Sequence, residues 1–287
     1  MDLLLEPLGT SIFLRSLAAV TLVGTVCAVV GTFVVLRGLA FIGDAISHAA
    51  FPGVVIAFLF RGPFYLGAAI AAVATALAIT FVSRRTRLRA DTTIGVLFAG
   101  TFALGIFLYS TIDGYVADLF AFLVGNVLAI SLADLIGLSV LAGIVLLAVL
   151  VLWKELLYAT FDPLGAAASG LPVTLLEYLF LVLVALTIVV SLQAVGIILV
   201  VAMLVTPPAA AQLLTVRFGR LLALAVAIGV GSSVVGLYAS FWLDVASGAT
   251  IVLVQTVAFL LALLVSQSRG LLTRRAAVVE ASGGQVS

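Results

Sequence analysis

The sequence contains few charged residues and a single cysteine. Charged side chains make up 9% of the 287 residues, whereas a typical soluble domain carries about 25%. Hydrophobic residues make up 65% of the chain, so a soluble protein of this size is nearly excluded. Cys27 lies in an apolar run and has no second cysteine with which to form a disulfide bond inside the chain. Redox chemistry is therefore not expected.

The sequence also lacks the motifs of a nucleotide-dependent or nucleophilic enzyme. No phosphate-binding loop of the form G-x-x-x-x-G-K-[ST] is present, and Lys154 is the only lysine. Any ATP must therefore be hydrolysed by a separate subunit. Ser47, the serine nearest to the single histidine, would point about 100° away from it on a helix, so no serine–histidine nucleophile is indicated. We expect no enzymatic activity, and the net charge of +1 gives no reason to expect nucleic acid as a partner.

Long apolar segments dominate what is present. About 20 apolar residues are needed to span a bilayer as a helix, and apolar windows bounded by charged residues predict nine spans. These windows are residues 13–36, 44–60, 64–83, 92–112, 132–153, 173–192, 196–214, 221–243 and 249–267. The stretch 117–130 is too short to cross comfortably, so it is expected to be re-entrant or at the outer surface. The predicted fold class is an all-α polytopic integral membrane protein with about eight to nine transmembrane helices.

Basic residues in the loops predict the orientation, because Lys and Arg near the ends of spans are retained in the cytoplasm. Placing residues 83–89 (SRRTRLR) inside leaves only Arg15 and Arg61 outside. The N-terminus is then outside and the C-terminus is cytoplasmic. The same parity places the hydrophilic segment 154–172 in the cytoplasm, where it is either a docking site for a partner protein or a plain connector.

The chain is expected to form one transmembrane domain over residues 1–275. A disordered tail is expected over residues 276–287, because the end of the chain (EASGGQVS) is small, polar and without aromatic residues. Nearly the whole protein is therefore expected to lie in the lipid bilayer.

The clearest candidate site is a carboxylate and an imidazole in the second span. Ionisable side chains cost about 2.5–3.5 kcal/mol at the middle of a membrane helix, so each needs a reason. His48, the only histidine, follows Asp44 by one helical turn, which places both side chains on one helix face. Such mixed oxygen and nitrogen donors suit zinc or manganese better than calcium, magnesium or copper(I). The alternatives are that Asp44 caps the helix and that His48 is a neutral buried histidine bonded to a neighbouring helix.

Three prolines indicate irregular backbone inside the spans. Proline cannot donate to the carbonyl four residues earlier, so Pro52 frees the carbonyl of His48, which is then available as a further ligand. Pro207 and Pro208 free two carbonyls in the seventh span in the same way. A broken helix at membrane depth usually lines a cavity or is covered by protein. A kink that only shapes packing is the alternative interpretation.

Around the acid and the imidazole, the segment GTFVVLRGLAFIGDAISHAAFPGV resembles the permease subunits of the zinc/manganese family of ATP-binding-cassette importers. That family shows an arginine, a short apolar stretch, Gly-Asp-Ala-x-Ser-His and a nearby Pro-Gly. The likeness continues at further segments in the same order, so it covers nearly the whole chain. These segments are Arg89–Gly95 (RADTTIG), Val124–Asp134 (VGNVLAISLAD), Ala194–Thr215 with its double proline, and Leu243–Thr250 (LDVASGAT).

The resemblance implies a permease in the plasma (inner) membrane of a prokaryote that pairs with a second copy of itself. Its substrate would be a divalent transition metal, zinc or manganese, moved into the cytoplasm, with no permanently bound cofactor. An extracytoplasmic metal-binding protein and two copies of a separate ATPase are the implied partners. Asp44 and His48 fall on the family's metal-ligand positions, and the loop around residues 161–171 is similar to the segment that docks in the ATPase. Its candidate coupling residues are Phe161, Asp162, Pro163, Gly170 and Leu171.

The alternative function is a stand-alone, ion-coupled metal carrier or channel. Such a protein would use the same pair of donors but would need no ATPase. Co-purification with an ATPase separates the two functions.

Overall fold

The computed structural model describes residues 6–112 and 127–283, and every regular element in these ranges is a helix. The α-helices are α2 (Ser11–Leu36), α3 (Ile42–Ala49), α4 (Phe51–Leu59), α5 (Phe64–Arg85), α6 (Ala90–Tyr109), α8 (Leu132–Val151), α9 (Trp153–Phe161), α10 (Pro163–Ala168), α11 (Val173–Leu214), α12 (Phe218–Leu243) and α13 (Ser247–Gly283). Two short 3-10 helices, η1 (Pro7–Gly9) and η2 (Val127–Ala129), complete the set. Within the described ranges, nine helical segments are long and apolar enough to cross a membrane, which confirms the predicted fold class.

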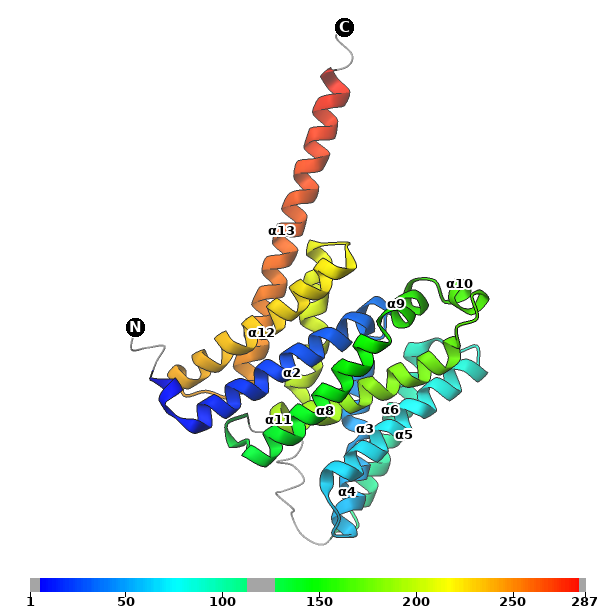
Figure 1. Cartoon of the computed structure of the whole chain (residues 1–287), viewed down its shortest axis with the longest axis vertical. Coiled ribbons are helices and arrows are strands. Elements are labelled where there is room, and N and C mark those ends of the chain that lie inside the picture. The colour runs from blue at the N-terminus through cyan, green and yellow to red at the C-terminus, as the bar shows by residue number, and fades with distance from the viewer. Residues whose placement is uncertain (1–5, 113–126, 284–287) are drawn as a thin grey trace.

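The core of the bundle lies around α2 and α11. Figure 1 shows α2 running through the middle of the molecule and α13 projecting beyond the other helices. α2 packs against α11 and α12, while α11 also contacts α3, α5, α8 and α13. Large side chains on three of these helices are fully buried, namely Phe33 on α2, Ile46 on α3 and Ile188 on α11. The short helix α3 is therefore held at the centre of the protein.

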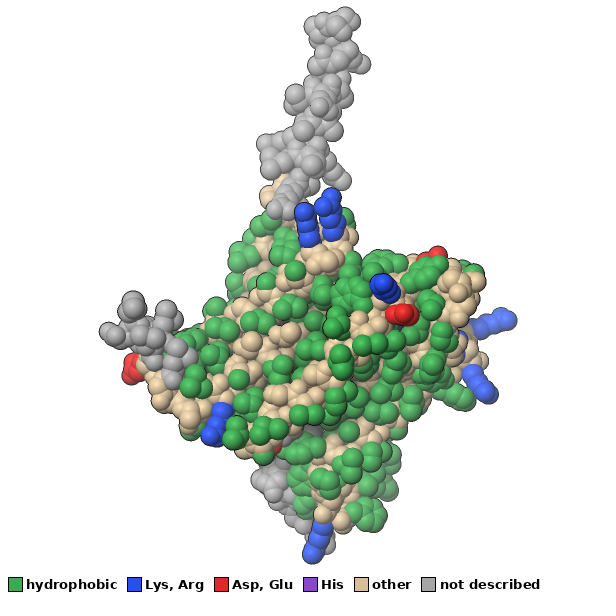
Figure 2. Space-filling view, viewed as in Figure 1, with side chains coloured by type: hydrophobic (Ala, Val, Ile, Leu, Met, Phe, Trp, Pro, Cys, Tyr) green, Lys and Arg blue, Asp and Glu red, His purple; other side chains and the backbone are tan. Residues whose placement is uncertain are grey.

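The outer surface is apolar between its ends. Exposed large hydrophobic side chains are frequent on α5, α6, α8 and α13. In the view of Figure 2, most of the Lys and Arg side chains lie toward the upper and right-hand ends, away from this apolar surface. A surface of this kind is typical of helices that face lipid, with charged groups kept to the membrane boundaries.

Two sequence expectations concern segments that are only partly described. Of the stretch 117–130, residues 117–126 lie outside the described residues. At the other end, α13 continues to Gly283, so residues 276–283 are helical where the sequence predicts a disordered tail. The alanines in this stretch have the highest helix propensity, which accounts for the continuation. Residues 284–287 lie outside the described residues.

The backbone break in α11 occurs at Gly196 rather than at the double proline. Gly196 has φ 78° and ψ 170°, a conformation that only glycine adopts readily. Pro207 and Pro208 instead lie inside continuous helix. The carbonyl of Leu204, which Pro208 leaves without its helical donor, faces Gly31 of α2, where an added Cβ would overlap with the carbonyl oxygen. Close packing by α2 therefore covers the irregularity that the prolines create.

Substitution of Gly31 is expected to destabilise the protein. In Gly31→Ala, the new methyl group must displace the backbone of α11, and overpacking of this kind costs about 1–3 kcal/mol. The expected result is a lower midpoint of thermal unfolding in detergent. Gly143→Ala on α8 is the matched control, because nothing lies within 4 Å of a Cβ built there. Equal midpoints for the two variants would contradict the close approach of α2 and α11.

Candidate metal site

Asp44 and His48 lie one turn apart on the same face of α3. His48 Nδ1 is 3.0 Å from the backbone carbonyl oxygen of Asp44 and 3.4 Å from its Oδ1 atom. The side chains of Asp44 and His48 are 48% and 25% exposed, respectively. Phe41 occupies the N-cap position of α3, and no side-chain hydrogen bond caps the helix. The capping interpretation of Asp44 is therefore not supported.

The hydrogen bond of His48 determines which ring nitrogen can bind a metal. A carbonyl oxygen only accepts hydrogen bonds, so in the neutral imidazole Nδ1 carries the proton and donates to the Asp44 carbonyl. Nε2 then carries the lone pair. A bond from the second ring nitrogen to an oxygen is the arrangement that orients metal-binding histidines. Here that oxygen comes from the same helix, so His48 is held by α3 itself.

Two phenylalanines of α6 hold the other side of the imidazole. The ring centroid of His48 is 5.4 Å from that of Phe98 and 5.2 Å from that of Phe102, with interplanar angles of 80° and 89°. Phe98 and Phe102 stack on one another at 6.0 Å and 9°. Edge-to-face pairs of this geometry contribute about 0.5–1.5 kcal/mol each beyond burial. The rotamer of His48 is thus fixed by a neighbouring helix as well as by its own.

Asp44 lines a cavity of about 230 Å³ between α3 and the start of α6. Asp91, in the first turn of α6, lines the same cavity, together with Phe98. Sequence analysis does not single out Asp91, because an acidic residue in the first turn of a helix is common for reasons of the helix dipole alone. Asp91 follows a short basic loop that brings the chain back near Asp44. This position is the feature of the sequence from which Asp91 could have been identified. The cavity therefore presents carboxylates from two helices.

A single chain supplies only part of a metal coordination sphere. Among the described residues, no group of three or more His, Cys, Asp or Glu side chains could hold a metal ion together. The thiol of Cys27 is buried and lies 3.5 Å from Ser191 Oγ, so its contact is with α11. Oxygen and imidazole nitrogen are thus the donors available around α3.

Pro52 lies one turn beyond His48, near the start of α4. Because Pro52 has no N–H, it cannot donate to the His48 carbonyl. The backbone at Ala50, which joins α3 to α4, stays in the right-handed helical region, so the two helices form one span. Gly105 of α6 allows this segment to pack closely, since an added Cβ would lie 2.7 Å from Phe51 and 3.0 Å from Pro52. The second span is therefore irregular next to the donors, and α6 covers the irregularity.

The hydrophilic segment 154–172 folds into two short helices at one end of the bundle. α9 contacts α2, α8 and α11, and α10 packs on α9 and α11 (Figure 1). Asp162 caps α10 by accepting a 2.8 Å hydrogen bond from the Gly165 N–H. Gly170 has φ 86° and ends the segment. Phe161 and Leu164 are exposed large apolar side chains here, and such exposure beyond the ends of the spans is typical of a protein-docking surface.

The nine apolar helices in the described part of the chain and the match to bacterial transport-system membrane proteins identify a multi-pass protein of the plasma membrane. The chain belongs to the ABC 3 transport family, whose sequence profile matches residues 10–266. The resemblance found from the sequence motifs is thereby confirmed, and the protein is a permease subunit of an ABC-type transport system.

The relatives are similar over nearly their whole length. The manganese transport system membrane protein MntC of Halalkalibacterium halodurans is 48% identical over 93% of this chain and 91% of that protein. The chelated iron transport system membrane protein YfeD of Yersinia pestis is 39% identical over 96% of this chain and 93% of that protein. Among solved structures, PsaBC from Streptococcus pneumoniae in complex with Fab has a chain that is 35% identical, with a TM-score of 0.80 over 91% of this chain and 94% of that chain.

Proposed function

We propose that this permease carries a divalent transition metal into the cytoplasm, and that manganese is its preferred ion. The proposed orientation has the N-terminus outside and the C-terminus inside. An ATPase subunit, present in two copies, would drive transport by docking on the segment 154–172. An extracytoplasmic binding protein would deliver the ion. The permease itself holds no permanent cofactor and catalyses no reaction, because the metal is its cargo.

The observation that carries the proposal is the geometry of Asp44 and His48. Both donors lie on one face of α3, Asp44 lines a cavity, and the hydrogen bond of His48 Nδ1 to the Asp44 carbonyl leaves Nε2 for the ion. The partial exposure of both side chains suits a site that an ion must enter and leave, since conduction requires binding that is not too tight.

The donor set supports manganese over zinc. The donors are the carboxylate of Asp44 and the imidazole of His48, and a second carboxylate, Asp91, lines the cavity beside Asp44 without completing a three-residue metal group among the described residues. Carboxylates suit manganese, whereas zinc is commonly held by thiolates and several imidazoles. The names of the relatives point to manganese and to iron, so Fe²⁺ is the competing cargo.

The incomplete donor set supports a dimer. Two protein donors per chain are fewer than a transition metal takes, and both are partly exposed. A second copy of α3 facing the first would double the donors to two carboxylates and two imidazoles. The proposed site therefore lies between two permease chains.

The test is ATP-driven uptake by the permease–ATPase complex in proteoliposomes, with the delivering protein supplied on the outside. Equal concentrations of Mn²⁺, Fe²⁺ and Zn²⁺ are compared, with and without ATP. Uptake that needs ATP and is fastest with Mn²⁺ is the expected result. Uptake that proceeds without ATP would favour a stand-alone carrier or channel, and uptake fastest with Zn²⁺ would overturn the choice of metal.

The phenylalanines around His48 are expected to tune the affinity of the site. In Phe102→Leu the edge contact with the imidazole is lost, and the ring gains rotational freedom that metal binding must remove. The loss of one aromatic pair corresponds to a two- to tenfold weaker affinity, that is, roughly one aromatic-pair energy. Mn²⁺ affinity of the purified complex is the measurement.

Phe107→Leu on the same helix is the matched control, because Phe107 is an exposed side chain on the outer surface. An unchanged affinity in Phe102→Leu, or an equal loss in both variants, would show that α6 does not position His48.

A further inference from the structure

Arg37 connects the end of α2 to the helix that carries the candidate donors. It is the C-cap residue of α2, and only four residues separate it from Ile42, the first residue of α3. The turn between them is tight, since Gly38 has φ 69° and the Leu39 N–H donates to the Val34 carbonyl at 3.0 Å. Because this connection is short and tight, a displacement of Arg37 would be transmitted to α3.

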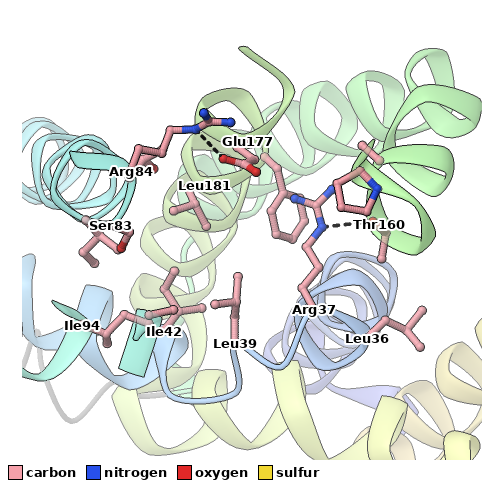
Figure 3. Close-up of a pocket in the computed structure, with 16 residues that line it drawn as sticks. Leu36, Arg37, Leu39, Ile42, Ser83, Arg84, Ile94, Thr160, Glu177 and Leu181 are labelled. Carbon is pink, nitrogen blue, oxygen red and sulfur yellow. Dashed lines mark hydrogen bonds and ion pairs between the residues drawn. The ribbon is translucent and has the colours of Figure 1, made fainter. Parts of the chain in front are cut away.

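The guanidinium of Arg37 is held by α9, in the hydrophilic segment 154–172, and by α11. Arg37 Nε donates a 3.0 Å hydrogen bond to Thr160 Oγ1, and the guanidinium carbon lies 4.1 Å above the centre of the Phe180 ring. Thr160 directly precedes Phe161, the last residue of α9. Figure 3 shows Arg37 reaching across from α2 toward Thr160, with Glu177 on the opposite side. One side chain thus joins α2, α9 and α11.

The guanidinium of Arg37 lies near other charged groups, but one of its hydrogen-bond donors has no partner among the described residues. Arg37 and Glu177 line a cavity of about 400 Å³, in which Glu177 Oε2 accepts a 2.7 Å bond from Arg84 Nε at the end of α5. Burial lowers the pKa of Arg37 to about 10 and Glu177 opposes this shift, so the guanidinium stays charged at neutral pH. Arg37 Nη2 is buried and has no hydrogen-bond partner among the described residues. An unpaired buried donor is unfavourable, so an arrangement that gave Nη2 an acceptor would be more stable for this group.

We propose that the Arg37–Thr160 hydrogen bond is the link through which the docking segment α9–α10 sets the position of α3, and hence of Asp44 and His48. Arg37 and Thr160 are positioning residues in this account, because neither contacts the transported ion. The inference rests on the proposed function, in that it assigns the coupling between ATP hydrolysis and the metal site. Movement of α9 on the ATPase would pull or release Arg37, and the tight turn would pass the displacement to α3.

The test is the amount of Mn²⁺ transported per ATP hydrolysed in proteoliposomes of the complete complex. Thr160→Val keeps the shape of the side chain and removes the acceptor, and the ratio is expected to fall at least about fivefold, the lower end of typical coupling factors. Thr160→Ser keeps the hydroxyl and is expected to retain the wild-type ratio. Mn²⁺ affinity without ATP should stay within about twofold in all variants, because the donors are intact. A role in stability alone would lower transport and hydrolysis together and leave the ratio unchanged.

Thr86→Val is the matched control, because the Thr86 hydroxyl bonds to the Val82 carbonyl at the end of α5, outside this network. If Thr160→Val does not assemble with the ATPase, the amount of Mn²⁺ transported per ATP hydrolysed is measured in Arg37→Lys instead. A wild-type ratio in the assembled Thr160→Val or Arg37→Lys complex overturns the link. Absence of ATP-driven metal transport by the wild-type complex is a different result and would count against the proposed function instead.

Discussion

Asp44→Ala and His48→Ala are each expected to abolish ATP-driven metal uptake while leaving membrane insertion and assembly with the ATPase intact. Each substitution removes one of the two donors that α3 brings together. Replacing even a supporting partner of a metal ligand typically costs 10–100-fold in affinity or activity, so loss of a ligand should reduce uptake by about 100-fold or more. Initial rates of Mn²⁺ uptake in proteoliposomes, normalised to the amount of assembled complex, are the measurement.

Ser47→Ala is the control for these variants. Ser47 neighbours His48 but is fully buried, and its hydroxyl donates to the Gly43 carbonyl of the same helix at 2.7 Å. Removing this hydroxyl should leave uptake near the wild-type rate. The same variant tests whether Ser47 takes part in a serine-based mechanism. Normal uptake by both Asp44→Ala and His48→Ala would show that the ion takes another route.

Gly170→Ala is expected to have the second largest effect, through the docking segment. At φ 86°, Gly170 adopts a backbone conformation that costs a residue with a Cβ about 1–2 kcal/mol. The turn that follows α10 should therefore leave its present conformation in most molecules, and the population competent to dock should fall by roughly tenfold. The expected result is a matching loss of ATPase in the co-purified complex.

The control is Gly219→Ala near the start of α12, where nothing lies within 4 Å of an added Cβ and the backbone is helical. Gly170→Asn should retain more ATPase than Gly170→Ala, because asparagine tolerates the left-handed region. Equal recovery of the ATPase with Gly170→Ala and Gly219→Ala would argue against docking at this segment. Replacement of Pro163, which begins α10 after the Asp162 cap, is expected to act in the same direction.

Local patterns in the sequence were sufficient for the spans and for the pairing of Asp44 with His48. A run of about 20 apolar residues has few alternatives to a membrane helix, and a spacing of four residues fixes a shared face once the helix exists. The structure accordingly holds nine spans in its described part and both donors on α3. These predictions needed no knowledge of which helices are neighbours.

Features that depend on neighbouring helices could not be predicted in this way. Phe98, Phe102 and Asp91 reach the site from α6, and no local pattern specifies that α6 packs on α3. The sequence leaves open whether the double proline breaks its helix or only shapes packing, and the helix continues because a neighbouring helix can cover a freed carbonyl when a glycine faces it. Gly31 is that glycine, and it is distant from the prolines in sequence.

The most direct test of the central claim is pulsed electron paramagnetic resonance of Mn²⁺ bound to the purified permease–ATPase complex. Coordination by Nε2 of His48 predicts a ¹⁴N modulation from a directly bound imidazole, which His48→Ala should remove. Since His48 is the only histidine of the chain, such a signal has one source in the permease. Mn²⁺ that binds stoichiometrically without nitrogen modulation, or with a modulation that survives in His48→Ala, would contradict the account.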